Sequence, residues 1–129
     1  MQSFKQSRTL QNTNAEEVLQ KLQSLLPANK FSVLHVHDVA ETLRGKDFEV
    51  EPYFIVEFCR APAAHKVLGE DPDIGLFLPC KLLVIGQGID VRITTFLPTS
   101  IGAFFPGLDL SEIAQEVERD ILSVMERIA

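Results

Sequence analysis

The strongest constraint on the fold is a hairpin signal in the second half of the chain. A long apolar run covers residues 74–85, the turn Gly86-Gln87-Gly88 follows, and a second apolar run covers residues 89–97. Two such runs around a glycine-containing turn are typical of paired antiparallel strands, because glycine adopts the positive φ that tight hairpin turns need. We therefore expect strands over 74–85 and 89–97. No helical pattern follows these glycines, so they predict a turn and not a phosphate-binding loop.

The rest of the chain alternates between shorter strand and helix patterns. Strand patterns occupy residues 3–9, 31–37 and 53–59. Helix patterns occupy residues 15–26, 39–44, 62–68 and 110–128. Three of these helices follow a possible capping box, with Asn14, Asp38 or Asp109 three residues before a glutamate. Pro27 is expected to end the first helix and Gly69 to close the third.

Residues 98–108 form an apolar segment that contains two prolines and two glycines. We expect no regular structure there, while Phe104 and Phe105 still need to be covered. Together these patterns predict an α+β fold, a two-layer sandwich with a mostly antiparallel sheet and two larger helices on one face. The other face of the sheet and the segment 98–108 are then available for self-association.

Length and charge narrow the classes of function. The 129 residues fit a single domain, 1–129, and the formal net charge of -6 disfavours a surface that collects phosphate backbones. No apolar stretch resembles a signal peptide or a membrane span, which predicts a cytoplasmic protein. Neither a nucleic acid nor a membrane is therefore expected as a partner, and no motif indicates a cofactor.

Cys59 is the first candidate for chemistry. It lies at the end of a predicted strand, just before a helix that begins near Pro62, where free backbone N–H groups and the helix dipole favour a thiolate. Arg60 places a positive charge next to it. The alternative is that Cys59 is a small buried packing residue, which most free cysteines are.

A second hypothesis is that Cys80 and His65 form one site together with Cys59. Cys80 follows Pro79 in an apolar run, and His65 projects from the helix after Cys59. Two thiols and an imidazole in one place form a soft site for zinc, copper(I) or iron, or a thiol pair tuned by a base. The spacing is not that of a paired Cys-x-x-Cys motif, and the apolar run around Cys80 favours the interpretation of Cys80 as a packing residue.

His35 and His37 are a separate candidate metal site. Two residues apart on a strand, they point to the same face about 7 Å apart, since each residue advances about 3.3 Å. Without a third ligand, the alternative is a polar strand face against solvent or a partner. Asp38 is better explained as a helix cap, and Glu57 as a residue of a solvated face.

One part of the sequence is similar to a known family. The positions concerned are Cys59, Pro62, Ala64-His65, Leu68, the run 71–75 and Leu78-Pro79-Cys80, with supporting stretches at 31–34 and 38–43. They resemble the signature of the bacterial and archaeal family catalogued as domain of unknown function 302. The resemblance covers about residues 14–95, and the C-terminal amphipathic helix over 110–128 is compatible with it. It implies a two-layer α+β domain that forms homodimers, and it implies no activity.

Two departures from the family pattern bear on the candidate site. The family continues its cysteine as Cys-Asn-Pro, whereas this chain reads Cys59-Arg60-Ala61-Pro62. The segment 98–108 is also richer in aromatic residues than the family pattern. The resemblance singles out Cys59, His65 and Cys80 as motif positions and assigns them no role.

Three hypotheses for function follow. The first is a homodimeric binding or carrier module, in which Cys59, Arg60, His65 and Cys80 hold a small ligand, a soft metal or a sulfur species. Its expected partners are a second copy of the chain and a small ligand or a sulfur carrier protein. The second is a dimeric scaffold or protein-interaction domain without chemistry. The third is a thiol-dependent transferase or reductase with Cys59 as nucleophile and His65 as base. The lack of an identifiable oxyanion donor or cofactor motif places the enzyme last.

Overall fold

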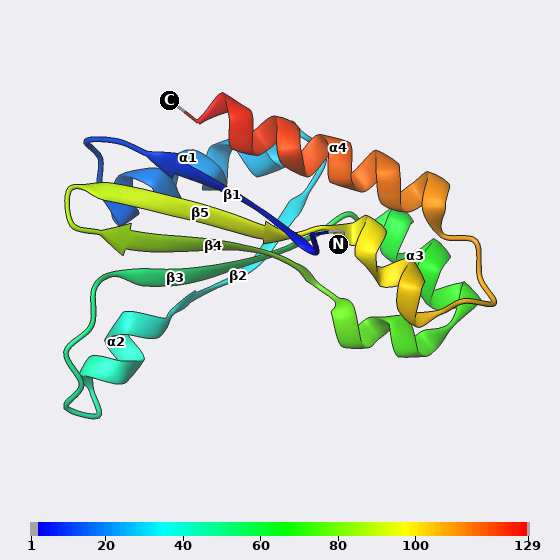
Figure 1. Cartoon of the computed structure of the whole chain (residues 1–129), viewed down its shortest axis with the longest axis horizontal. Coiled ribbons are helices and arrows are strands. Elements are labelled where there is room, and N and C mark those ends of the chain that lie inside the picture. The colour runs from blue at the N-terminus through cyan, green and yellow to red at the C-terminus, as the bar shows by residue number, and fades with distance from the viewer. Residues whose placement is uncertain (1–2, 129) are drawn as a thin grey trace.

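The fold is built on a single five-stranded antiparallel sheet, seen in a computed structural model that describes residues 3–128 (Figure 1). The strand order is β1-β5-β4-β3-β2, and each neighbouring pair is antiparallel. The strands are β1 (Lys5–Leu10), β2 (Ser32–Asp38), β3 (Tyr53–Cys59), β4 (Cys80–Gln87) and β5 (Asp90–Phe96). The predicted hairpin is confirmed as β4 and β5, with Gln87 opposite Asp90. Gly88 has φ 64 in its turn, a conformation that glycine adopts without steric cost.

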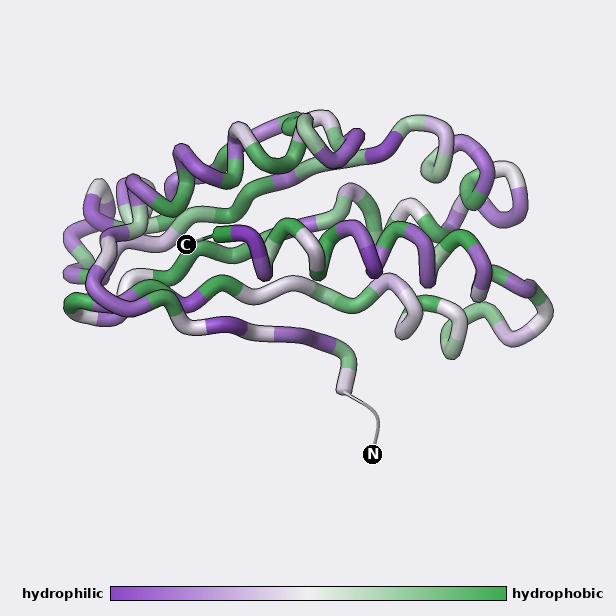
Figure 2. Tube along the Cα trace, turned by 90° about the horizontal axis from the view of Figure 1, so that it is seen from above, coloured by the Kyte–Doolittle hydropathy of each residue, from purple (hydrophilic) through white to green (hydrophobic). Residues whose placement is uncertain are grey.

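Two long helices cover one face of the sheet. They are α1 (Ala15–Ala28) and α4 (Ser111–Arg127), and both contribute side chains to the same hydrophobic core as the strands. Along α4, hydrophobic and hydrophilic residues alternate with the turns of the helix (Figure 2). The predicted α+β class, with two larger helices on one face, is therefore confirmed. Among residues 3–128, no helix has the length and apolar character needed to cross a bilayer.

The core follows from strand alternation. On β3, Phe54, Val56 and Phe58 point to the helices and are buried, while the residues between them lie on the other face and are half-buried. Phe58 is 0% exposed and meets Phe31 edge to face, with ring centroids 5.1 Å apart. From α1, Val18, Leu22 and Leu26 pack on this layer at helical spacing.

Shorter elements complete the connections. They are α2 (Val39–Arg44), which joins β2 to β3, α3 (Ala61–Glu70), and the 3₁₀ helices η1 (Pro72–Phe77) and η2 (Pro98–Phe104). The predicted caps at Asn14 and Asp38 are present, since their side-chain oxygens accept the backbone N–H groups of Glu17 and Glu41 at 3.0 and 2.9 Å. The predicted cap at Asp109 differs. Its carboxylate accepts hydrogen bonds from the backbone N–H and the hydroxyl of Ser111, which is two residues later and not three.

The expected strand over 74–85 is wrong in its first part. Residues 72–77 form η1, and β4 begins only at Cys80. Apolar character alone does not separate a buried strand from a buried helical turn, and here Asp71 starts the turn by accepting the backbone N–H of Asp73. Gly86 is also not a turn residue: it lies in β4, and its N–H donates to the Pro52 carbonyl at 2.8 Å.

Two further boundaries need correction. Pro27 does not end α1, which continues to Ala28, and Gly69 lies inside α3.

The segment 98–108, expected to be irregular, contains the 3₁₀ helix η2. Its Phe105 packs edge to face on Phe77, whereas Phe104 remains 63% exposed beside the same ring.

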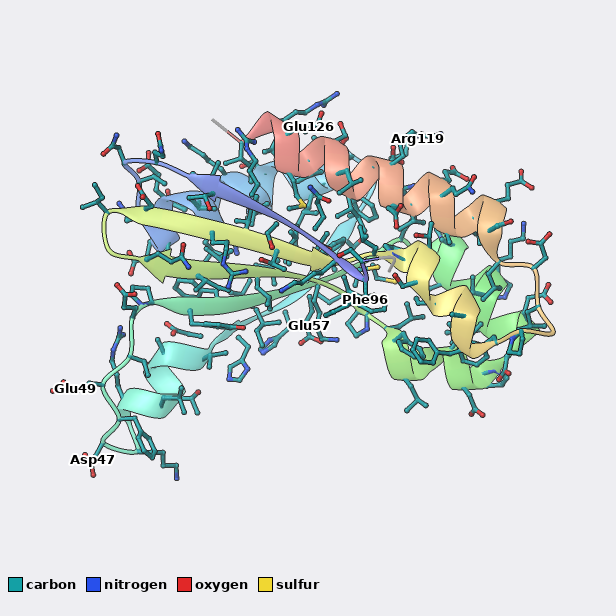
Figure 3. All side chains as sticks on the ribbon, in the orientation of Figure 1. Asp47, Glu49, Glu57, Phe96, Arg119 and Glu126 are labelled. Carbon is teal, nitrogen blue, oxygen red and sulfur yellow. The ribbon has the colours of Figure 1, made fainter. Side chains whose placement is uncertain are left out.

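The face of the sheet opposite α1 and α4 carries no helix layer (Figure 1). Half-buried apolar residues occupy its middle, with polar and charged residues around them. The apolar group is Tyr53, Ile55, Leu83 and Ile85, and we call this surface the open sheet face. Glu57 and Lys81 are opposite each other in the β3–β4 register at its border. In Figure 3, Glu57 and Phe96 lie away from the outer surface of α4, where Arg119 and Glu126 project.

Candidate functional site

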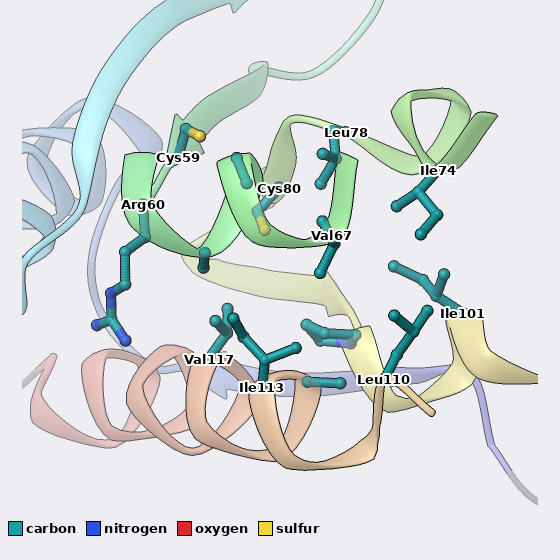
Figure 4. A pocket seen from close by; sticks show the side chains of 14 residues that line it. Cys59, Arg60, Val67, Ile74, Leu78, Cys80, Ile101, Leu110, Ile113 and Val117 are labelled. Atoms are coloured by element: carbon teal, nitrogen blue, oxygen red, sulfur yellow. The ribbon is translucent and has the colours of Figure 1, made fainter. Parts of the chain in front are cut away.

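A small apolar cavity lies at the end of the sheet where β3 stops and β4 begins. Its volume is about 60 Å³. It lies between α3 and α4, with η1 and η2 at one end (Figure 4). Fourteen residues line it: Cys59, Arg60, Ala63, Ala64, Val67, Ile74, Leu78, Cys80, Pro98, Ile101, Leu110, Ile113, Ala114 and Val117. Arg60 is the one charged residue in this set.

The sequence explains why space remains between these elements. The face that α3 turns toward α4 carries Ala63, Ala64 and Val67, and the opposing part of α4 carries Ala114. None of the ten residues of α3 is buried. Short side chains on both helices leave room that larger residues would fill, so α3 packs lightly over the cavity.

Both predicted cysteines line this cavity, although 21 positions separate them. Cys59 is the last residue of β3 and Cys80 the first of β4, and Cys80 is opposite Phe58 in the strand register. Both are free thiols with half-buried side chains. The antiparallel pairing of β3 with β4 therefore brings the two sulfur atoms to the same end of the sheet.

The surroundings keep both thiols protonated. Burial raises the pKa of Cys59 above its ordinary value. Burial, and then the nearby Cys59, raises the pKa of Cys80 to about 11. This corrects the expectation that the N-terminus of the following helix and Arg60 favour a thiolate at Cys59. For that position, desolvation outweighs both effects.

The thiol pKa values predict how alkylation depends on pH. At pH 7.5 we expect iodoacetamide to modify Cys80 at least about a hundredfold more slowly than a cysteine in an unfolded peptide, because the thiolate fraction falls about tenfold for each unit of pKa. The rate should rise steadily up to about pH 11. A Cys59→Ser variant isolates Cys80, and the same chain in urea provides the unfolded rate. Peptide-like labelling of the native variant at pH 7.5 would contradict the assignment.

The same shift fixes the sign of a pH effect on stability. The pKa of Cys80 rises from its ordinary value of 9.0 to about 11 on folding. Between these values the unfolded chain has released the proton and the folded chain retains it. The free energy of unfolding is therefore unaffected by this group below about pH 9 and decreases as the pH rises toward 11.

Three contacts hold the Arg60 guanidinium. Its Nη2 lies 2.8 Å from Oδ2 of Asp120 on α4 and donates to the carbonyl oxygen of Asn29 at 2.7 Å. The guanidinium also lies over the ring of Phe31, 4.3 Å from the centroid. Figure 4 shows it directed toward α4 at the edge of the cavity. Arg60 therefore connects the end of β3 to both long helices.

His65 does not join the thiols. It is exposed on α3 and is not among the residues that line the cavity. Across residues 3–128, no group of three or more His, Cys, Asp and Glu side chains is arranged to hold a metal ion. The expected cluster of two thiols and an imidazole is thus not assembled, because the helix directs His65 outward while Ala64 and Val67 face inward.

His35 and His37 lie on one face of β2, as the two-residue spacing predicts. Their ring centroids are 6.3 Å apart and nearly stacked, and Nε2 of His37 lies 3.3 Å from the Thr42 hydroxyl. His35 is opposite Glu57 in the register, yet these three side chains are not arranged as a metal site. The pair forms part of the polar border of the open sheet face.

Comparisons with known proteins agree with this fold. The family model described as "Domain of unknown function DUF302" matches residues 6–128. The chain belongs to the DUF302 family. Its structure is similar to the crystal structure of an uncharacterized conserved DUF302 protein from Bacillus stearothermophilus, with 29% sequence identity, a TM-score of 0.88, and coverage of 99% of this chain and 100% of that one. A search of curated proteins found no match.

The family match extends beyond the expected residues 14–95 and includes α4. This matters for the site, because α4 supplies Ile113, Ala114 and Val117 to the cavity and Asp120 to Arg60. The sequence analysis did not identify these residues of α4 as part of the site. Ala63 and Ala64 of α3 were the one available signal, since short side chains on a helix leave space beside it.

Proposed function

We propose that this DUF302 protein is a small-molecule binding module whose ligand occupies the cavity between α3 and α4. The single observation that carries the proposal is the apolar cavity lined by both motif cysteines. Concave apolar sites with a few polar groups are the usual form of ligand pockets in proteins. The lightly packed α3 offers a route of entry, because an element with no buried residue opens at low cost.

The raised thiol pKa values favour binding over catalysis. A cysteine nucleophile reacts as the thiolate, and burial keeps both thiols protonated here. His65 does not line the cavity and so is not placed as a base for either of them. The thiols are accordingly assigned as polarizable groups of the cavity wall.

Filling the cavity tests the proposal. We expect benzene, benzoate or benzylamine to shift NMR resonances of α3 and α4 in the native protein. An Ala64→Leu variant should lose this response, because the added side chain occupies the cavity. Ala61→Leu makes the same change at an exposed position of the same helix and should retain it. If both variants keep the response, or if none of the three probes gives a response in the native protein, the cavity is excluded as a binding site.

We also propose that the protein assembles as a homodimer through the open sheet face. Tyr53, Ile55, Leu83 and Ile85 form an apolar centre with a polar border, which is the usual anatomy of an interface. Five strands about 4.8 Å apart and about 23 Å long give a flat area of roughly 550 Å², on the order of one partner's share of a standard interface. Glu57 and Lys81 on the same border supply opposite charges for a two-fold related copy.

A charge at the centre of this face should prevent the association. We expect Leu83→Arg to convert the dimer to a monomer in light scattering coupled to size-exclusion chromatography. Gln87→Arg adds the same charge at the exposed end of the same strand and should leave the dimer intact. If Phe104→Asp dissociates the protein and Leu83→Arg does not, the interface lies instead at the exposed aromatic ring of η2.

A further inference from the structure

The chemical character of the ligand can be read from the cavity wall. We propose that the cavity between α3 and α4 selects an uncharged, apolar molecule no larger than benzene. This inference rests on the proposed binding function and specifies its ligand class. It follows from three properties of the cavity: its volume, the ion pair that compensates the charge of Arg60, and the protonated state of the Cys59 and Cys80 thiols.

The volume sets the size of the ligand. The cavity of about 60 Å³ is smaller than the cavity of roughly 150 Å³ that is known to accept benzene. A single ring therefore enters only if α3, none of whose residues is buried, moves slightly outward, and benzene is an upper limit for the ligand. A long lipid chain or a nucleotide does not fit without separation of α3 from α4.

The charge of Arg60 is already compensated. Asp120 lies 2.8 Å from its guanidinium, and the Asn29 carbonyl and the Phe31 ring take two further contacts. Its ε N–H is buried without a hydrogen-bond acceptor in the described part of the chain. The guanidinium lies at the cavity edge and is directed toward α4, so this donor does not face the centre (Figure 4). An anionic ligand would therefore lose its hydration without gaining an unpaired cation.

The thiols offer no countercharge to a cation. A thiol with an ordinary pKa is already neutral at pH 7, and burial raises both pKa values further. A thiol is a weak hydrogen-bond donor, and its sulfur makes favourable contacts with the edges of aromatic rings. The remaining lining side chains in Figure 4, such as Val67, Ile101 and Ile113, are hydrocarbons. An uncharged ring thus matches every part of this wall.

The test compares three probes that share a ring and differ in charge, namely benzene, benzoate and benzylamine. By titration of the native protein at pH 7, we expect benzene to bind at least about tenfold more tightly than either ion. If benzoate or benzylamine binds as tightly as benzene and Ala64→Leu abolishes that binding, the cavity is a ligand site but the inferred class is wrong. If none of the three binds, the proposed function itself fails.

A variant then tests the role given to the compensated charge. Asp120→Asn leaves the guanidinium without its carboxylate, and we expect it to increase benzoate affinity relative to benzene by at least about fivefold. Glu116→Gln removes one negative charge from an exposed position one turn away on α4 and should leave the ratio unchanged. An unchanged ratio in a folded Asp120→Asn protein would overturn the charge argument. If that variant does not fold, the ranking of the three probes on the native protein still decides the class.

Discussion

The Phe58→Ala substitution is expected to lower the free energy of unfolding by about 3–5 kcal/mol, the range measured for truncating fully buried aromatic residues. Phe58 is 0% exposed, and it contacts Phe31 at a centroid distance of 5.1 Å. It also lies opposite Cys80 in the sheet, next to the thiol end of the cavity. Its removal therefore leaves a void between the sheet and the helix layer that neighbouring rings cannot close.

Denaturation in urea, followed by circular dichroism, measures this loss. The matched control is Phe48→Ala, which removes the same atoms from a ring that is 61% exposed in the connection between α2 and β3. We expect the control to change the free energy of unfolding by less than about 0.5 kcal/mol. A loss below about 1.5 kcal/mol for Phe58→Ala would show that this region of the core relaxes around the missing ring.

The sheet was predictable because its signal is local. Strand β3 and helix α2 have the bounds that the sequence predicts, since alternation at 53–59 and the Asp38 cap are each contained in a few consecutive residues. The caps and the amphipathic pattern of α4 are likewise local. By contrast, residues 74–77 are apolar whether they form a strand or a helical turn, and Ile74 of η1 packs in one cluster with Ile101 of η2. That contact is distant in the sequence and leaves no periodic signal.

The candidate site was predictable only in part. The family motif marked Cys59 and Cys80, and the strand pairing explains why they meet. It also marked His65, which the helical phase directs outward. The protonation of the thiols was missed because the sequence shows the helix start but not the desolvation that opposes it. Nothing in the sequence pairs Arg60 with Asp120, sixty positions later.

Replacement of Arg60 by methionine should lower the free energy of unfolding by about 2–3 kcal/mol. The substitution removes an ion pair with Asp120, a charged hydrogen bond to the Asn29 carbonyl and the contact with the Phe31 ring. A buried ion pair that loses one partner costs about 3–5 kcal/mol. The Asp120 side chain is 31% exposed and regains water, which reduces this penalty.

Arg119→Met provides the matched control for Arg60→Met. Arg119 is 73% exposed and lies 3.9 Å from the same carboxylate, so its loss should cost less than about 0.5 kcal/mol. Hydrogen exchange gives a second readout, because Arg60 lies at the N-terminus of α3 and connects it to α4. We expect faster exchange of the α3 amides in Arg60→Met than in Arg119→Met, beyond the difference in global stability. Equal exchange in the two variants would mean that α3 is held over the cavity by its apolar contacts alone, and that the ion pair stabilises the fold without controlling entry.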